Sequence, residues 1–140
     1  MTLHCYLNFD GTAEAAMRFY ALALGGTLTE PHRFGAMPGA KLPEELKNRV
    51  MHVRLDLPDG QALLASDTLP GRGPAHVMGT NFSVSVHPSS RDEADRVFNA
   101  LAEGGSVTVP LADQFWGAYF GALTDRFGVQ WMVNQPAGPA

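Results

Sequence analysis

The chain has 140 residues, of which 17% are charged and 45% are hydrophobic, and its formal net charge is −4. This length suits one domain with an ordinary core, and the apolar content is too high for a disordered chain. The ten Lys and Arg residues are scattered, which argues against nucleic-acid or anionic-membrane partners. No apolar run approaches the roughly 18 residues of a membrane span, and the N-terminus lacks a signal-peptide pattern. A single cysteine, Cys5, excludes an internal disulfide, so we expect a cytoplasmic protein.

The first half of the chain predicts one helix and four strands. Apolar and polar residues alternate over 3–10, which predicts a strand, and residues 14–26 predict a helix that ends at Gly25-Gly26. Further strand-like runs cover about 27–34, 50–57 and 61–66. The long segment 34–48 is typical of a lid or a binding loop.

The second half predicts the same order of elements after a linker rich in Gly and Pro. A strand over 82–87 precedes a helix that begins at the capping box Ser90-Arg91-Asp92-Glu93 and ends at Gly104-Gly105. Three strands follow at about 106–111, 117–124 and 129–134. Asp125 and Gly128 predict a type I turn between the last two strands, and Asp67 predicts a turn or a cap.

An internal repeat explains this order. At an offset of 79 residues the segments 14–26 and 93–105 share eight of thirteen residues, and the alignment places Phe19 and Phe98 in equivalent buried positions. We therefore predict an α+β fold in which two tandem βαβββ modules form one open, barrel-like mixed sheet. The single domain would span 1–140, with module one at about 1–66, the linker at 67–79, module two at about 80–134 and a frayed tail at 135–140. A cleft between the modules is where a ligand would sit.

Several motifs carry a resemblance to a known family over nearly the whole chain. They lie at residues 6–11, 19–20, 34–38, 51–53, 66–67, 114–121 and 124–132, and the run 114–121 (QFWGAYFG) is the most specific. The chain resembles the PhnB-like branch of the vicinal-oxygen-chelate superfamily, which includes glyoxalase I, extradiol dioxygenases and bleomycin-resistance proteins. The resemblance implies the glyoxalase/bleomycin-resistance fold and a homodimer. The branch is often labelled a ubiquinone-pathway methyltransferase, but no glycine-rich nucleotide loop follows the first strand here.

The resemblance also implies where a metal would bind. Metal-using members place His, Glu or Gln on the first and last strands of each module. His4, Leu64 and Met132 stand at three of these positions here, and Asn81 or Ser83 stands at the fourth. Because Leu and Met supply no carboxylate or imidazole, His4 is the only retained candidate ligand. We therefore predict no conventional metal site and no cofactor.

Six residues are candidates to line a ligand site: His4, Tyr6, His52, Asn81, Trp116 and Trp131. Alternation places His4 and Tyr6 on the polar face of the first strand, and two indoles and a phenol suit a flat, moderately polar molecule. Trp131 and Met132 are adjacent in a strand, so only one of them can face the site. Each histidine could instead be a half-buried strand residue with a backbone hydrogen bond.

Two functions fit these observations. The first is a metal-free homodimer that binds a small organic molecule in the cleft. The second is a metal-dependent lyase, isomerase or dioxygenase that uses His4 with His52; catalytic residues stay unassigned. A purely structural module is a third alternative, but it gives no reason for the polar strand faces. No nucleophile is evident, because Cys5 lies among apolar residues and Ser83 and Ser85 have no base nearby in the sequence.

Overall fold

The computed structural model describes residues 1–136, which divide into two compact units. Unit 1 is Met1–Val77, and unit 2 begins at Met78, so the boundary lies within the predicted linker 67–79. Of the tail predicted at 135–140, residues 137–140 lie outside the described residues, and Gln135 belongs to a strand instead of the tail. No helix within residues 1–136 is long and apolar enough to cross a membrane.

Unit 1 follows the predicted order, with short additional elements. They are β1 (Cys5–Phe9), α1 (Ala13–Leu24), β2 (Thr27–Leu28), β3 (His32–Arg33), η1 (Phe34–Ala36), α2 (Glu44–Lys47), β4 (Val50–Asp56), η2 (Pro58–Gly60) and β5 (Ala62–Asp67). The single strand predicted over 27–34 is divided into β2 and β3. Pro31 lies between them, and it has no N–H to continue a strand ladder.

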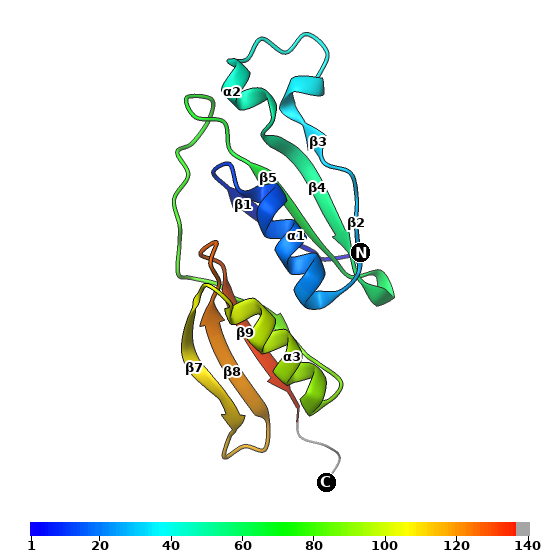
Figure 1. Cartoon of the computed structure of the whole chain (residues 1–140), viewed down its shortest axis with the longest axis vertical. Helices are drawn as coiled ribbons and strands as arrows, with labels where there is room; N and C mark the ends of the chain where they lie inside the picture. Colours follow the sequence, from blue (N-terminus) through cyan, green and yellow to red (C-terminus); the bar gives the residue numbers. More distant parts are fainter. Residues whose placement is uncertain (137–140) are drawn as a thin grey trace. The chain divides into compact units, whose positions relative to one another are not determined.

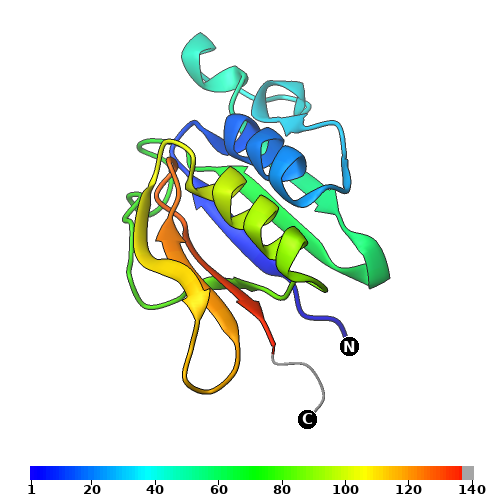
Figure 2. The same ribbon diagram turned by 60° about the horizontal axis from the view of Figure 1, so that its bottom comes forward.

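The sheet of unit 1 has the order β1-β5-β4-β2, with β3 also paired to β4. β1 runs parallel to β5, and β4 is antiparallel to each of its neighbours. Helix α1 packs on one face of this sheet (Figures 1 and 2), because its apolar stripe needs an apolar surface. The core between them contains Leu7, Phe9, Ala16, Met17, Tyr20, Val53, Leu55, Leu63 and Ala65. Since side chains alternate along a strand, the residues between these core positions face the other side of the sheet.

Unit 2 repeats the arrangement with four strands. Its elements are β6 (Val84–Val86), α3 (Arg91–Ala102), β7 (Ser106–Asp113), β8 (Tyr119–Thr124) and β9 (Gln130–Gln135), and the sheet order is β6-β9-β8-β7. Helix α3 packs against this sheet (Figure 1). Its buried residues Val97, Phe98 and Leu101 form the core of unit 2 together with Leu123 and Val133 of the sheet. The predicted α+β fold of two βαβββ modules is therefore confirmed. The strand pairs of the described residues form two open mixed sheets, one in each unit.

The repeat holds for the elements, but the residue alignment is wrong by one position in the helices. Phe98 is buried at 5% exposure, whereas Phe19 is only half-buried and its neighbour Tyr20 is fully buried. The cause lies at the helix ends. Gly25 directly follows α1, whereas Glu103 separates the end of α3 from the glycine pair, so aligning the glycines shifts the helices by one residue.

Candidate functional site

One face of the unit 1 sheet is left uncovered by α1, and it carries Tyr6 and His52. The Tyr6 hydroxyl lies 3.3 Å from His52 Nδ1, and the two ring centroids are 5.9 Å apart. Tyr6 comes from β1 and His52 from β4, so the pair reaches across β5, which lies between these strands. Tyr6 is 46% exposed and His52 is half-buried, which leaves both rings accessible to a bound molecule.

Small polar groups surround this pair. We call the surface formed by Tyr6, Asn8, His52, Leu64 and Ser66 the open face of unit 1. Ser66 Oγ lies 3.4 Å from Asn8 Oδ1, and Leu64 pairs with Tyr6 in the strand register. The open face therefore combines an apolar side chain with several hydrogen-bonding groups and contains no carboxylate.

The charged groups next to the open face are already paired. Arg54 and Asp56 follow His52 along β4 on the same side of the strand, and Arg54 Nε donates to Asp56 Oδ1 at 2.5 Å. Their charges offset each other, so this pair gives the open face no free charge for an anionic ligand.

The positions that hold metal ligands in the superfamily do not fit a metal here. His4 precedes β1 and is half-buried, Leu64 lies beside Tyr6, and Met132 pairs with Ser85 in unit 2. Leu64 offers no donor atom, and a thioether is a poor ligand for borderline cations. Within residues 1–136 no group of three or more His, Cys, Asp or Glu side chains is arranged to hold a metal ion. We therefore assign no chemical step to a metal.

Trp131 lies in the core of unit 2. It is 1% exposed, and its indole Nε1 donates to Asp125 Oδ2 at 2.8 Å. Its neighbour Met132 is half-exposed, as strand alternation requires when Trp131 points inward. Since the buried ring offers no surface to a ligand, we leave Trp131 out of the site.

The loop between β7 and β8 exposes two aromatic rings. Phe115 is 98% exposed and Trp116 is 55% exposed, and they pack edge to face with centroids 5.1 Å apart. Trp116 also lies 6.1 Å from the ring of Phe120 on β8. Asn81 is an exposed residue before β6. Two of the six predicted site residues, Tyr6 and His52, lie in direct contact.

Two buried aspartates have functions that the sequence predicted only in part. Asp67 Oδ1 accepts hydrogen bonds from the backbone N–H groups of Gly11 and Ala13, both at 2.9 Å, and Oδ2 accepts from Val50 N at 2.8 Å. The predicted cap is thus confirmed, although it caps a distant helix. The predicted turn at Asp125 is also confirmed, since Gly128 N donates to Asp125 O at 3.0 Å. The signal for both was an acidic residue at the end of an apolar strand.

Two candidate nucleophiles differ in their surroundings. Ser85 Oγ lies 3.0 Å from His87 Nε2, so the prediction that this serine has no nearby base is wrong. Residues two apart on a strand share a face, which places the pair together on the exposed edge of the sheet. For Cys5, burial raises the pKa of the thiol, which disfavours the reactive thiolate and agrees with its predicted inertness.

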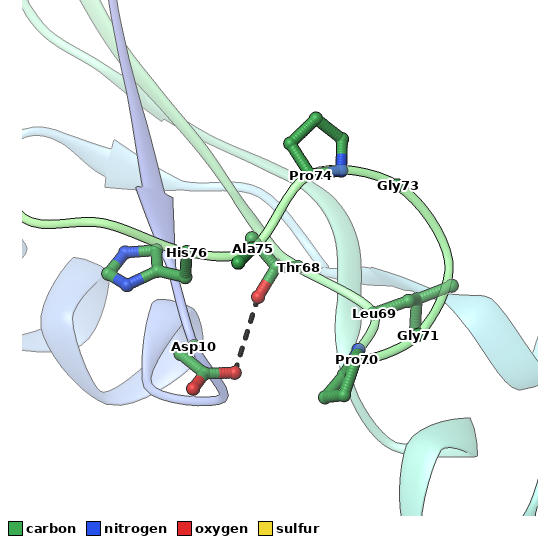
Figure 3. Close-up of a pocket in the computed structure, with 9 residues that line it drawn as sticks. All are labelled: Asp10, Thr68, Leu69, Pro70, Gly71, Gly73, Pro74, Ala75 and His76. Atoms are coloured by element: carbon green, nitrogen blue, oxygen red, sulfur yellow. Dashed lines mark hydrogen bonds between the residues drawn. The ribbon is translucent and has the colours of Figure 1, made fainter.

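A cavity of about 500 Å³ lies in unit 1 beneath the linker loop 69–75 (Figure 3). Asp10, Thr68 and His76 line it together with residues of that loop. Asp10 Oδ1 accepts hydrogen bonds from Arg49 Nη1 at 2.7 Å and from Thr68 Oγ1 at 3.2 Å. The Arg49 guanidinium, followed by the Thr68 hydroxyl, holds the pKa of Asp10 below its ordinary value. The carboxylate is therefore already paired with a cation.

Comparison with known proteins relates the whole chain to one family. Residues 2–134 match the family model described as 3-demethylubiquinone-9 3-methyltransferase. The chain is 30% identical to Protein YjdN of Escherichia coli K12, and the match covers 96% of this chain and 95% of that protein.

Solved structures extend the likeness to the fold. Protein PA1353 from Pseudomonas aeruginosa is 43% identical, with a TM-score of 0.84 and 99% of each chain covered. The PhnB protein from Bacillus cereus is 26% identical, with a TM-score of 0.76 over 97% of this chain and 100% of that one. A glyoxylase/bleomycin resistance protein/dioxygenase domain from Frankia is 15% identical, with a TM-score of 0.65 over 100% and 94% of the two chains. This last likeness supports the fold alone.

Proposed function

Since the chain belongs to the 3-demethylubiquinone-9 3-methyltransferase family, within the PhnB-like branch of the glyoxalase/bleomycin-resistance proteins, we propose that it binds a small organic molecule on the open face of unit 1. The contact between Tyr6 and His52 is the observation that carries this proposal. The proposed binding needs no tightly held metal and no cofactor.

The chemistry of the open face supports a flat and moderately polar ligand. Tyr6 can donate or accept a hydrogen bond through its hydroxyl, and the neutral imidazole of His52 offers one donor and one acceptor. Leu64 supplies apolar surface beside them, and Asn8 and Ser66 add further polar groups. A few polar groups on a partly apolar surface are typical of small-molecule sites.

Besides the buried Trp131, three predicted residues lie outside the open face as defined. Trp116 stays a prediction as a ligand contact of unit 2, since an exposed indole can stack on a flat molecule. His4 and Asn81 stay predictions, supported by the half-buried position of His4 and the exposure of Asn81.

The same pair favours a second candidate function, a lyase, isomerase or dioxygenase. A hydrogen bond to Nδ1 fixes the orientation of an imidazole, and this is the arrangement that proton transfer at Nε2 needs. Methyl transfer is not part of the proposal, because β1 leads into Asp10-Gly11-Thr12 and not into a glycine-rich nucleotide loop.

Fragment binding followed by NMR tests the ligand site. Phenols, aromatic carboxylic acids and quinones would be titrated into labelled protein, with the amide shifts of β1, β4 and β5 as the readout. We expect Tyr6→Phe and His52→Ala each to weaken binding by about 2–10-fold, as the loss of one hydrogen bond does. The control Leu22→Ala, at an exposed position of α1, should bind as the unmodified protein does. Fragments that bind only at other residues, or equally well to all variants, contradict the proposal.

Elemental analysis of untagged protein tests the metal-free part of the proposal. We expect substoichiometric transition metal after purification without chelators. One equivalent of zinc, nickel, manganese or iron would instead favour the metal-dependent lyase, isomerase or dioxygenase.

We also propose a cytoplasmic homodimer. Both units leave sheet edges, and β7 is an edge strand of eight residues that is exposed along nearly its whole length. Proteins tend to pair or cover such edges. Sedimentation should give a mass of about twice the 15.0 kDa of one chain, and a monomer at high concentration contradicts the proposal.

A further inference from the structure

The last segment of unit 1, residues 68–77, is folded onto the rest of that unit along most of its length. Thr68 anchors its beginning: its N–H donates to Phe9 O at 2.7 Å, its hydroxyl donates to Asp10, and its carbonyl accepts from Arg49 Nη1 at 2.9 Å. In the middle of the loop, Arg72 Nη2 donates to Lys41 O at 3.1 Å. Residues 68–75 therefore form a docked loop and not a free linker.

His76 anchors the end of this loop. Its Nε2 lies 3.1 Å from the backbone oxygen of Asn8 in β1, and since a carbonyl only accepts, the imidazole donates. Figure 3 shows the His76 ring near Asp10, at the opposite end of the loop from Leu69. Asn8 lies near the end of β1 and Asp10 directly follows this strand, so the two ends of the loop are held by one short stretch of unit 1.

The contacts with unit 2 begin only two residues later. A Cβ added to Gly128 would fall 2.2 Å from Met78 Cε, so the Met78 methyl group lies directly on the turn between β8 and β9. Gln130 Nε2 then reaches Gly79 O at 3.4 Å and Phe82 O at 3.0 Å. Val77 alone lies between the two anchors; it is 82% exposed, and the two units meet in sequence at this residue.

We propose that Val77 is the hinge between the two units. The contacts of His76 with unit 1 and of Met78 with unit 2 limit this hinge to one residue. Each side chain fixes the chain to its own unit on either side of Val77. One free residue spans at most about 3.5 Å, so the two anchored residues stay close together in space. Release of His76 would extend the free chain back to Arg72, and release of Met78 would extend it towards Gly79.

Distance measurements between the units test the hinge. Spin labels would be placed at Leu22→Cys in α1 and Asn99→Cys in α3, both exposed, in a Cys5→Ser background. We expect His76→Ala to broaden the distribution of distances between the labels, and Met78→Ala to broaden it as well. The control His87→Ala removes an exposed histidine of unit 2 that lies against Ser85. Distributions that do not change in His76→Ala and Met78→Ala overturn the proposal.

Proteolysis independently tests whether His76 holds the loop on unit 1. Trypsin can cut after Arg72, and cleavage needs the loop to leave unit 1. We expect His76→Ala to raise the cleavage rate at this bond by about 3–10-fold, as the loss of one hydrogen bond allows. His76→Gln should restore most of the protection, because its amide nitrogen can occupy the place of Nε2. Equal cleavage of His76→Ala and the unmodified protein contradicts the proposed role of His76 in holding the loop. Equal cleavage of the Ala and Gln variants contradicts it as well. Both experiments are independent of any ligand.

Discussion

The two helices begin in different ways, although they occupy the same place in the two modules. Ser90, with extended backbone at φ −148°, caps α3 by accepting a hydrogen bond from Glu93 N at 3.1 Å. Thr12 precedes α1 with φ −110° and ψ 11°, and its side chain caps nothing. Asp67 supplies the cap instead, from the end of β5. One copy of the repeat is therefore capped by adjacent sequence, and the other by a residue that only folding brings near.

Replacement of Asp67, the cap of α1, should have the largest effect on stability. Asp67→Ala leaves three backbone N–H groups without their acceptor, two at the start of α1 and one at the start of β4. At about 1–3 kcal/mol for each buried donor, we expect a loss of about 4 kcal/mol in the free energy of unfolding. Urea denaturation followed by circular dichroism measures it. A loss below about 1 kcal/mol would show that water or a rearranged backbone satisfies these groups.

The other buried aspartate acts over a shorter range, and Trp131 tests it. Asp125 binds the N–H groups of Phe127 and Val129 through Oδ1 and the indole of Trp131 through Oδ2. Trp131→Phe should lower the free energy of unfolding by about 2 kcal/mol, because it removes core contacts and the hydrogen bond from the indole to Asp125 Oδ2. Trp116→Phe, at an exposed tryptophan, is the control and should change stability little. Equal effects of the two replacements would contradict the burial of Trp131.

A matched pair of variants compares the local caps at the starts of the two helices. Ser90→Ala removes a side-chain cap and should cost about 1 kcal/mol. Thr12→Ala removes a side chain that makes no cap and should cost less than about 0.5 kcal/mol. Denaturant titrations of the two variants measure the difference. The distinction fails if Thr12→Ala costs as much as Ser90→Ala.

The smallest expected effect concerns Glu14 in the first turn of α1. Hydrogen bonds from Arg18 and then Arg33 hold the pKa of Glu14 below its ordinary value of 4.5. A lowered pKa in the folded state means that ionised Glu14 stabilises the protein above about pH 4.5, and that this contribution is lost as the pH falls through the folded-state pKa. Glu14→Gln should therefore be less stable than the unmodified protein at pH 7. The difference in the free energy of unfolding between the two proteins should disappear as the pH falls below 4.5, as urea denaturation at several pH values would show. A difference in stability that does not change with pH would show that the ion pairs of Glu14 do not cause it.

The fold could be predicted from the sequence because its signals are local. Period-two alternation indicated the strands, and the capping box with its glycine pair bounded the second helix. The alignment of the repeat slipped by one residue in the helices because Gly25 directly follows α1, whereas Glu103 separates α3 from its glycine pair. Pro31 was visible in the sequence, yet its division of β2 from β3 depended on the pairing with β4.

The site was predicted less completely, because a site depends on which strands become neighbours. The sequence placed Tyr6 and His52 among the candidates, but only the order β1-β5-β4 brings these two rings within reach of each other. Alternation along the strand allowed either Trp131 or Met132 to face a ligand. In the folded chain α3 packs against β9, and Trp131 is the residue of this pair that is buried. The contact between Ser85 on β6 and His87, which directly follows this strand, was within reach of sequence reasoning and was missed.

The sequence by itself determined the two modules, their βαβββ order and the chemical types of the residues on the polar strand faces, because periodicity and turn chemistry act over a few neighbouring residues. The tertiary structure alone decided that Asp67 caps a helix 54 residues away, that Tyr6 and His52 form a pair, and that His76 and Met78 enclose a single free residue. These contacts join residues far apart in the chain. Their geometry follows from strand order and packing, which no local pattern specifies.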